Sequence, residues 1–361
     1  MQRLATFVHI SDLHFGDLDP ATDDAVLDAR PPPYWPRFRW LDGYAGHSGV
    51  ALRHLDDFYR GSPASPGLKH SENAALLVTG DLTAVGSPSE FALGRSYLEG
   101  TATLTTGSTV GLGELNVVAT RAVPGNHDHW PGRRMTRGRP FVMWGLPTPA
   151  LGATFPRLPI PLWRFPVGGG LIVVVAGINT DADVRPHFPS CSRLLARGRF
   201  ISQLAQLESQ LTPIDPNEIR VLMLHHSPHH AGRVLGINKG SRQALDAVIT
   251  RCEISVLLTG HVHVPGGNVA TTTNGAATWD VFEARCGTTT QRDLLPVGWQ
   301  MGSPPLAPNT LLVHRLFRRD DGRVEWAAEV CERSARGFRS KGALRLQGRL
   351  PGQGVVVWPR T

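Results

Sequence analysis

Short apolar runs that end abruptly in polar or Gly residues recur along the chain. Runs of this kind, rich in Val, Ile and Leu, are typical of parallel strands that are buried on both faces. We predict six such strands, at residues 4–10, 75–79, 115–123, 171–178, 219–224 and 254–259. Four intervening segments carry apolar residues at helical spacing, at residues 50–59, 88–98, 200–211 and 242–252. Strands that alternate with helices predict a layered α/β fold.

The start of one helix is marked by its capping residues. Ser87-Pro88-Ser89-Glu90 has the spacing of a capping box, with Pro at the first helical position. We therefore expect this helix to begin at Pro88 and to run to about Leu98.

The last third of the chain has a different pattern. Residues 268–290 and 310–330 are rich in Thr, Val and Trp, which favours antiparallel strands. Asp320-Asp321-Gly322 has the composition of a hairpin turn. These segments predict a mixed sheet or a second sheet.

The composition is that of an ordinary globular protein. Of 361 residues, 41% are hydrophobic and 19% charged, which excludes wholesale disorder and collagen-like repeats. No apolar run approaches the length of a membrane span or a secretory leader, so we expect a cytoplasmic location. The four cysteines are widely spaced and form no Cys-x-x-Cys pair, so we expect them to be reduced and structural.

The net charge of +7 is concentrated at one end of the chain. Residues 333–361 contain seven basic and no acidic residues, so residues 1–332 are neutral overall. We therefore predict one main domain at 1–332 and a basic C-terminal tail at 333–361. Two long connections, 17–46 and 129–166, are rich in Arg and aromatic residues, and long loops of this kind are often lids or binding surfaces.

Possible metal ligands follow five of the predicted strands. Asp12 and His14 are two residues apart, so that on an extended backbone both side chains would point to one face. The remaining strand ends are Gly80-Asp81, Gly125-Asn126-His127-Asp128, His225-His226 and Gly260-His261-Val262-His263. Any one of these motifs alone is most simply a turn or a cap. All five together, at strand ends that face one crevice, indicate a metal site.

This ordered set resembles the calcineurin-like metallophosphoesterase superfamily, over residues 12 to about 290. Ile-Ser-Asp-Leu-His-Phe-Gly at 10–16 and Leu-His-His-Ser-Pro at 224–228 are most similar to the bacterial class III cyclic-nucleotide phosphodiesterases. The resemblance implies a four-layer αββα sandwich of two mixed β-sheets flanked by helices. It places the metal site at the C-terminal ends of the strands.

The same resemblance implies which residues bind two metal ions. It places Asp12, His14 and His263 on one ion. Asn126, His225 and His261 bind the other, and Asp81 bridges the two. Two cations about 3.5 to 4 Å apart require a bridging carboxylate to offset their repulsion. The mixed ligands suit divalent or trivalent transition-metal ions, namely Mn, Fe, Zn or Co.

Several further histidines need an assignment. The resemblance gives His127 a catalytic role outside the metal ligands, as a proton donor to the leaving oxygen or a hydrogen-bond donor to the phosphoryl group. The alternative for His127 is a purely structural role. His226 is the alternative ligand to His225, whereas His229 and His230 are expected at the rim of the site. Family members often have an Asp where this chain has Ala84, so the orientation of His127 must come from another group.

These observations predict a dinuclear metal-dependent phosphoesterase. The expected reaction is hydrolysis of a small-molecule phosphate ester by attack of a metal-bound hydroxide, and a phosphodiester such as a cyclic nucleotide is the favoured substrate. One alternative is a nuclease or another nucleic-acid-directed phosphoesterase, for which the basic tail is the special support. A non-catalytic scaffold of the same fold ranks lower, because all seven ligands are present. The sequence identifies neither substrate-binding residues nor an oligomeric state.

Overall fold

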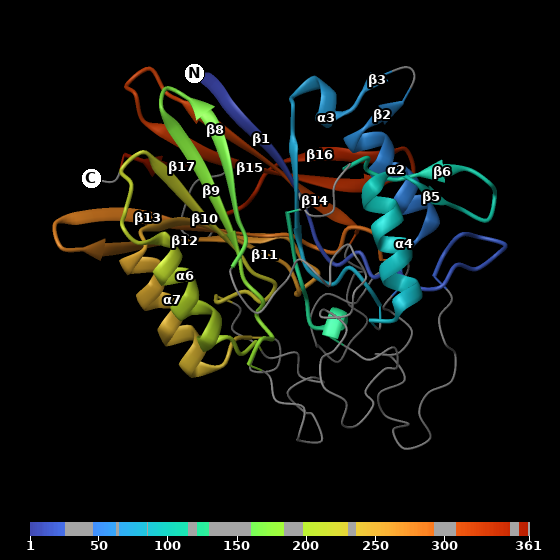
Figure 1. The fold of residues 1–361 in the computed structure, drawn as a ribbon. Helices are drawn as coiled ribbons and strands as arrows, with labels where there is room; N and C mark the ends of the chain where they lie inside the picture. Colours follow the sequence, from blue (N-terminus) through green and yellow to red (C-terminus); the bar gives the residue numbers. More distant parts are fainter. Residues whose placement is uncertain are drawn as a thin grey trace, which may run out of the picture.

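Two β-sheets face each other, and helices cover their outer faces (Figure 1). The computed structural model describes residues 1–25, 46–62, 65–84, 86–114, 121–129, 160–183, 198–229, 236–291, 308–346 and 354–359. The two sheets run side by side, with the N-terminus at one end and the loops after β1, β4 and β11 towards the other. The predicted four-layer αββα sandwich of two mixed sheets is confirmed.

The first sheet combines parallel and antiparallel strands. Its order is β16-β15-β14-β1-β4-β7, with β17 paired to β15. β1, β4 and β7 are parallel, and the other pairs are antiparallel. The bounds are β1 (Gln2–Ile10), β4 (Ala75–Thr79), β7 (Arg121–Val123), β14 (Thr310–Arg318), β15 (Val324–Ser334), β16 (Gly337–Ala343) and β17 (Val355–Trp358).

The second sheet has a parallel centre and an antiparallel strand at each edge. Its order is β12-β13-β11-β10-β9-β8. β9, β10, β11 and β13 are parallel, while β8 and β12 pair antiparallel at the two edges. The bounds are β8 (Leu162–Gly168), β9 (Leu171–Gly177), β10 (Glu218–Met223), β11 (Ile254–Thr259), β12 (Gly266–Asn274) and β13 (Ala277–Arg285). Two small hairpins accompany the sheets: β2 (Gly61–Ser62) with β3 (Ser65–Pro66), and β5 (Ala102–Thr103) with β6 (Thr109–Val110).

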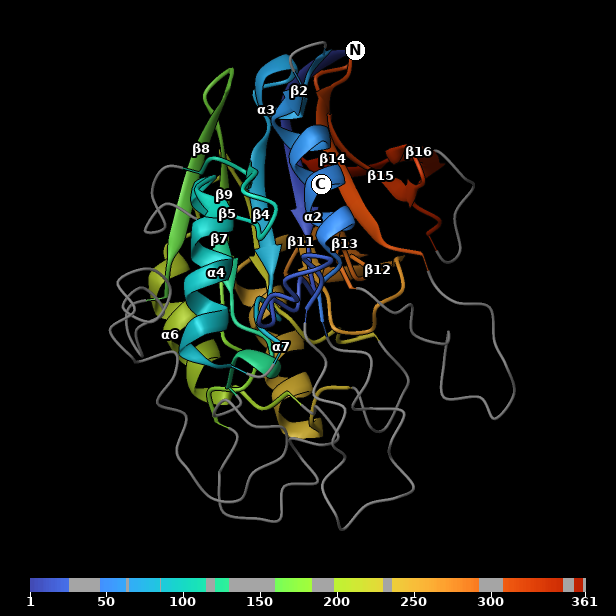
Figure 2. The same cartoon turned by 90° about the vertical axis from the view of Figure 1, so that its right-hand side faces the viewer.

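The helices lie on opposite sides of the sandwich (Figures 1 and 2). α2 (Gly49–Tyr59), α3 (Leu68–Ser71) and α4 (Pro88–Glu99) accompany the first sheet, while α6 (Ile201–Leu211) and α7 (Lys239–Arg251) cover the second. α4 begins with the predicted capping box: Ser87 accepts from the Glu90 amide, and the Glu90 side chain accepts from the Ser87 amide. Among the described helices, none is long and apolar enough to cross a membrane.

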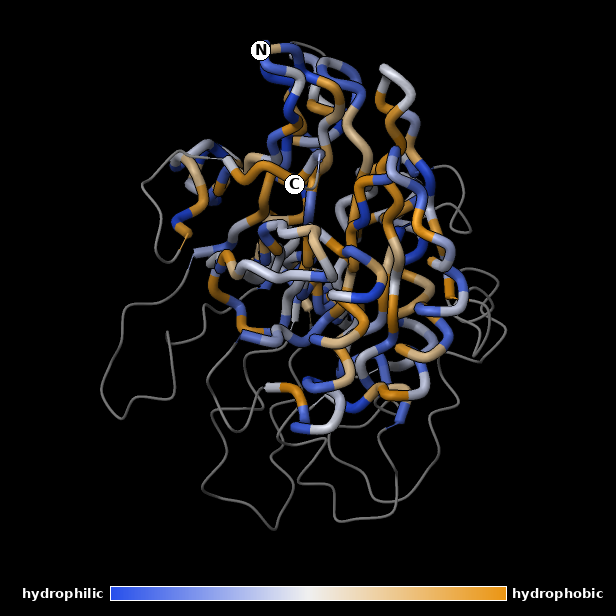
Figure 3. The backbone as a smooth tube through the Cα atoms, turned by 90° about the vertical axis from the view of Figure 1, so that its left-hand side faces the viewer, coloured by the Kyte–Doolittle hydropathy of each residue, from blue (hydrophilic) through white to orange (hydrophobic). Residues whose placement is uncertain are grey.

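Successive side chains of a strand point to opposite faces of the sheet, so the apolar residues are divided among three cores. In β1, Val8 and Ile10 pack under α2 and α4, whereas Phe7 packs between the sheets. The middle core therefore holds residues from both sheets, including Phe7 stacked on Trp326 at 5.5 Å between ring centroids. The tube coloured by hydropathy shows the apolar strands inside the sandwich (Figure 3). Because central strands are buried on both faces, their sequences are continuous apolar runs.

A chain of polar groups crosses this apolar middle layer. Trp326 Nε1 donates to His314 Nδ1 at 3.0 Å. His314 Nε2 must then donate to His9 Nδ1 at 3.3 Å, and His9 Nε2 to the Thr79 hydroxyl at 2.8 Å. Burial lowers the pKa of His9 to about 3, so both rings remain neutral. His9 is thus a core residue with both ring nitrogens satisfied.

The structure corrects some sequence boundaries and leaves others untested. Residues 286–290, predicted to be strand, follow the end of β13 and form no strand. Residues 115–120 and most of the two long connections lie outside the described residues. The separate basic tail from residue 333 stays a prediction; its described part contributes β16 and β17 to the first sheet. Cys252, Cys286 and Cys331 are buried and free, and Cys191 is not described.

Candidate metal centre

The loops after β1, β4, β7, β10 and β11 meet at one end of the sandwich. They bring together all seven predicted ligands, which are Asp12, His14, Asp81, Asn126, His225, His261 and His263. The first group of possible ligand atoms comes from Asp12, His14, Asp81 and His263, and the second from Asp81, His225 and His261. Within each group the atoms lie within 4.8 Å of one another. Asp81 belongs to both groups, which is the position of a bridging carboxylate.

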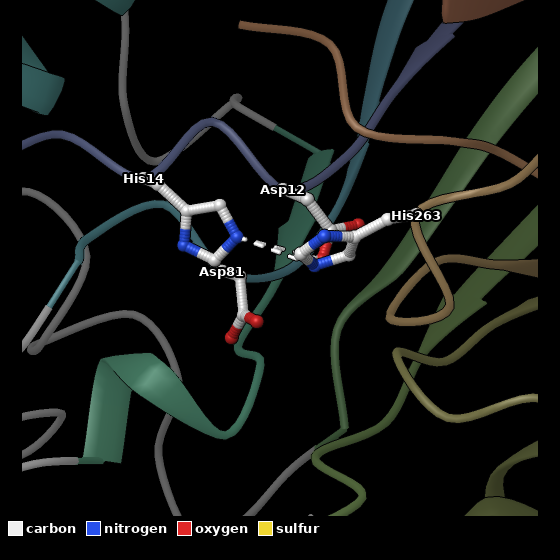
Figure 4. Close-up of side chains that lie close together, drawn as sticks. All are labelled: Asp12, His14, Asp81 and His263. Atoms are coloured by element: carbon white, nitrogen blue, oxygen red, sulfur yellow. Dashed lines mark hydrogen bonds and ion pairs between the residues drawn. The ribbon is translucent and has the colours of Figure 1, made fainter. Parts of the chain in front are cut away.

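In the first group, Asp12 and two imidazoles face one another (Figure 4). His263 Nε2 lies 3.1 Å from Asp12 Oδ1, and His14 Nε2 lies 3.8 Å from the same oxygen. The two Nε2 atoms are 3.5 Å apart. Three donor atoms from two different sheets therefore converge on one point.

The second group is centred on His225. Its Nε2 lies 3.2 Å from Asp81 Oδ2, 3.1 Å from His261 Nδ1 and 3.2 Å from Asn126 Oδ1. The Nδ1 of His225 lies 2.7 Å from the Thr79 carbonyl, which can only accept, so Nδ1 carries the proton and Nε2 is free to bind a cation. The Asn126 oxygen completes an oxygen and nitrogen donor set around Asp81.

The cluster has the unsatisfied polar atoms that a cation would use. Among the described residues, the buried atoms Asp12 Oδ1 and Asp81 Oδ2 have no hydrogen-bond partner apart from the imidazole nitrogens of His263 and His225, which lie 3.1 and 3.2 Å away. Leaving a buried polar atom without a partner is costly unless a ligand or an ion satisfies it. Carboxylate, imidazole and amide donors suit Mn, Fe, Co or Zn. The residues present therefore fit the dinuclear transition-metal centre that the sequence implied.

The backbone at the cluster is strongly bent, which corrects one expectation. Asp12 and His14 have φ values of 54° and 51°, so they are left-handed and not extended. Asp81, His261 and His263 are also left-handed, with φ values of 50°, 70° and 60°. Such conformations cost of order 1 kcal/mol or more for a residue other than Gly. Five strained ligand residues in one place are typical of a functional site.

Two glycines allow the loops to approach closely. A Cβ atom on Gly125 would lie 2.1 Å from Asp81 Oδ1 and 2.4 Å from the Asp81 amide. A Cβ atom on Gly260 would lie 1.9 Å from Ser11 Oγ. Only Gly fits at these positions, which explains the Gly that precedes Asn126 and the Gly that precedes His261.

The charges of the cluster depend on one another. Burial lowers the pKa of His225, but the charge of Asp81, its hydrogen bond and the charge of Asp12 outweigh burial and raise the pKa to about 10. Burial raises the pKa of Asp81, but His225 and His127 hold it well below its usual value. Burial, with a contribution from His127, lowers the pKa of His14 to about 3. Before metal binds, His225 is therefore the protonated ligand, and the proton must leave when the cation enters.

His127 lies beside both groups. Its amide donates to Asp81 Oδ1 at 2.8 Å, and its Nε2 lies 3.9 Å from Asp81 Oδ2. Its Nδ1 donates to the Ala84 carbonyl at 2.7 Å, so a backbone oxygen orients the ring. The ring packs edge-on against His14, with centroids 4.7 Å apart. Burial lowers the pKa of His127, while the charge of Asp81 opposes this effect.

His226, the alternative ligand, and His229, which was expected at the rim, lie outside the two ligand groups. His226 Nδ1 contacts the Thr180 hydroxyl at 2.7 Å, so the structure places His225 and not His226 at the centre of the second group. His229 is exposed, with Nδ1 2.7 Å from the carboxylate of Glu283. His230 is outside the described residues.

Two buried carboxylates support the loops. Asp128 accepts from the amides of Thr83 and Gly125 at 2.8 and 3.0 Å, and burial together with the charge of Asp81 raises its pKa to about 6. The sequence analysis missed Glu283. This residue of β13 accepts from four side chains, which are Ser227 at 2.5 Å, His229 at 2.7 Å, Thr259 at 3.0 Å and Asn268 at 3.1 Å. The signal that could have revealed it is an acidic residue inside the apolar pattern of residues 281–286.

Comparison with known proteins gives one family match. The model of the calcineurin-like phosphoesterase family matches residues 5–265. Among solved structures, the chain is similar to GAP50, the anchor in the inner membrane complex of Plasmodium, with 11% identity, coverage of 95% of this chain and 90% of that chain, and a TM-score of 0.49. It is similar to Vps29 of Chaetomium thermophilum with 12% identity, coverage of 91% and 96%, and a TM-score of 0.28. No curated protein matches. The family match includes every loop of the cluster, from Asp12 to His263.

Proposed function

The chain belongs to the calcineurin-like phosphoesterase family and is a metallophosphoesterase, and we propose that it hydrolyses a phosphodiester such as a cyclic nucleotide. The convergence of six candidate ligands in two groups that share Asp81, with the Asn126 oxygen beside the second group, carries the proposal. The similarity of residues 10–16 and 224–228 to class III cyclic-nucleotide phosphodiesterases supports the substrate class.

Each ligand group would hold one metal ion. Asp12, His14 and His263 would bind the first, Asn126, His225 and His261 the second, and Asp81 both. When bound, such a pair of ions lowers the pKa of water and stabilises the charge of a phosphoryl group. The protein keeps the donor atoms in place, since buried hydrogen bonds fix both Asp12 and His225.

His127 is positioned to assist the leaving group. The Ala84 carbonyl fixes the ring through Nδ1, which leaves Nε2 as the nitrogen nearest the Asp81 carboxylate. Because Nδ1 already carries a proton, donation from Nε2 requires the imidazolium form. The negative charge of a bound phosphate favours that form. His127 would then hydrogen-bond the phosphoryl group or deliver a proton to the leaving oxygen, a contribution of about 10²- to 10⁴-fold.

The charge of the site suits a phosphate ester. Two divalent ions, with the carboxylates of Asp12 and Asp81, would leave a net charge of +2. This charge attracts the anionic phosphate of a phosphodiester or a phosphomonoester, so the choice between them rests on the sequence similarity and on the assay below.

A substrate panel tests the proposal. Metal-free protein reconstituted with Mn²⁺, Fe²⁺, Co²⁺ or Zn²⁺ is assayed on p-nitrophenyl phosphate, bis(p-nitrophenyl) phosphate, cyclic nucleotides and single-stranded DNA. We expect turnover of the diesters with at least one metal. Asn126→Ala should lose metal, while His127→Ala should retain both ions and lose turnover.

The panel also separates the alternatives. Preference for the monoester would refute the diester assignment, and hydrolysis of DNA in preference to the small diesters would favour the nuclease. Metal binding without hydrolysis of any ester would favour the scaffold. For His127→Ala, the loss should be greater for the alkoxide leaving group of a cyclic nucleotide than for p-nitrophenolate, which departs without a proton.

A further inference from the structure

Three consecutive threonines, Thr288–Thr290, lie fully buried against the metal cluster. They follow β13 and were predicted to be strand, but they form none. We call Thr288–Thr290 the threonine segment. A run of three buried hydroxyl groups is unusual in a core unless each has a partner, because an unsatisfied hydroxyl is costly.

The hydroxyl groups of the threonine segment bind the loop after β1. Thr288 Oγ1 donates to the Asp12 carbonyl at 3.0 Å, and Thr290 Oγ1 donates to the Leu13 carbonyl at 2.6 Å. Thr289 Oγ1 accepts from the Ser11 amide at 3.1 Å and donates to the Thr310 carbonyl at 3.1 Å. The three side chains therefore hold three consecutive residues of the loop that carries Asp12 and His14.

The backbone around the threonine segment binds the same loop and the loop after β11. The Thr289 amide donates to the Ser11 carbonyl at 3.0 Å, and the Thr288 amide lies 3.5 Å from the His263 carbonyl. The Cys286 amide donates to the Thr259 carbonyl at 2.8 Å. The segment thus joins the loop of Asp12 and His14 to the loop of His263. These are the two loops that supply the first ligand group.

Those loops need an external support because their backbone is strained. Asp12, His14 and His263 all have left-handed φ values, which residues other than Gly adopt only when surrounding contacts impose them. The hydroxyl of Thr288 binds the carbonyl of the left-handed Asp12, and the hydroxyl of Thr290 binds the carbonyl of Leu13, which lies between the two left-handed ligand residues.

We propose that Thr288 and Thr290 are positioning residues for the first metal ion, because they hold the backbone of Asp12 and Leu13 in the ligand-presenting conformation. The proposal rests on the metal site of the proposed function. Neither threonine is a ligand. Without its hydroxyl the loop relaxes in the metal-free protein, and the ion must restore the strained conformation when it binds, which weakens its affinity.

Mn²⁺ titration of the metal-free protein tests this role. Free Mn²⁺ is followed by electron paramagnetic resonance for wild type, Thr288→Val, Thr290→Val and the double variant. The loss of one buried hydrogen bond should raise the dissociation constant of one of the two ions about 3- to 10-fold, and the double variant should raise it more. The other ion should keep its affinity within about twofold. Thr288→Ser and Thr290→Ser, which keep the hydroxyl, should restore the wild-type value.

Two controls distinguish positioning from a general loss of stability. Thr6→Val removes a buried hydroxyl that donates to Glu72, far from the cluster, and should leave both ions unaffected. In a His14→Ala background the first group is already disabled, so the Val substitutions should not change the affinity of the remaining ion. A purely structural role would lower the melting temperature of the metal-free protein, and this effect would persist in the His14→Ala background.

The outcomes for the two proposals differ. If wild type binds two Mn²⁺ ions and both Val variants bind them with unchanged affinity, the positioning role is wrong and the proposed function stands. If wild type binds no Mn²⁺ or other transition-metal ion, both fail. If a Val variant does not fold, Thr288→Ala and Thr290→Ala are titrated against the same criterion.

Discussion

Glu283 gives the sharpest test of how the protein stabilises its buried charges. The side chain is fully buried on β13 and accepts four hydrogen bonds, among them one from His229 and one from Ser227. Burial by itself raises the pKa of Glu283, but the hydrogen bond and charge of His229, with the hydrogen bonds from Ser227 and Asn268, lower the pKa from 4.5 to about 2. At about 1.4 kcal/mol per tenfold change in the proton affinity, this shift stabilises the fold by roughly 3 kcal/mol at neutral pH.

The pH dependence of this contribution follows from the direction of the shift. Because the pKa is lower in the folded protein than in the unfolded chain, the ionised carboxylate stabilises the fold at every pH above about 4.5. The contribution is lost as the pH falls from 4.5 towards 2. In Glu283→Gln, an amide nitrogen replaces an acceptor oxygen and faces donors. We therefore expect this variant to be less stable than wild type by roughly 3 kcal/mol at pH 7 and by about 1.4 kcal/mol at pH 3.

Urea unfolding measures this difference in stability between metal-free wild type and variant. Unfolding is followed by Trp fluorescence at pH 7, 5, 4 and 3 and at constant ionic strength. Glu208→Gln is the matched control, because Glu208 pairs with Arg251 at the surface and its replacement should change stability little at any pH. A Glu283→Gln variant as stable as wild type at pH 7 would contradict the reasoning. A loss of stability that is the same at pH 7 and pH 3 would also contradict it, since it would not depend on ionisation.

Three further predictions concern the cluster and a buried ion pair. Gly125→Ala places a Cβ atom 2.1 Å from Asp81 Oδ1, so the variant should bind less metal and turn over at least about 100-fold more slowly. Elemental analysis measures the metal content, and a full content would contradict the close approach. Metal binding at pH 7.5 should release about one proton, because the pKa of His225 is raised to about 10. Calorimetry in buffers of different ionisation enthalpy measures this release. Equal apparent binding enthalpies in all buffers would contradict it. Arg220→Met should destabilise the protein by about 3 kcal/mol in urea unfolding, because it removes the buried guanidinium that pairs with the buried carboxylate of Glu218. A change below about 1 kcal/mol would contradict a requirement for the pair.

The sequence predicted where the ligands meet, because each ligand follows an apolar strand. Parallel strands direct their carboxyl ends to one edge of a sheet, which accounts for the ligands within each sheet. Asp12 and His263 follow strands of different sheets, so their contact across 251 positions also depends on how the two sheets pack, which the order of the motifs does not show. Patterns of apolar residues also gave the strands at 75–79 and 254–259 with the bounds that the structure shows.

Features that depend on backbone atoms and distant partners could not be predicted. The left-handed conformation at Asp12 and His14 depends on amide hydrogen bonds to the carbonyls of Gly80 and Asp81, which no local pattern encodes. The support for His127 is a carbonyl oxygen, which every residue has, so the presence of Ala84 in the sequence did not reveal it. The pairing of β1 with β14 joins segments about 300 residues apart and could not be read from either alone.

The ligand residues come from both sheets of the sandwich, so metal binding also affects the stability of the fold. Asp12, His14, Asp81 and Asn126 follow strands of the first sheet, whereas His225, His261 and His263 follow strands of the second. Each ion would therefore tie one half of the molecule to the other. Since any ligand that binds only the folded state raises its stability in proportion to the logarithm of its concentration, chelation should weaken the contact between the halves. Heat resistance, measured with no substrate present, would then report how many ions the enzyme carries.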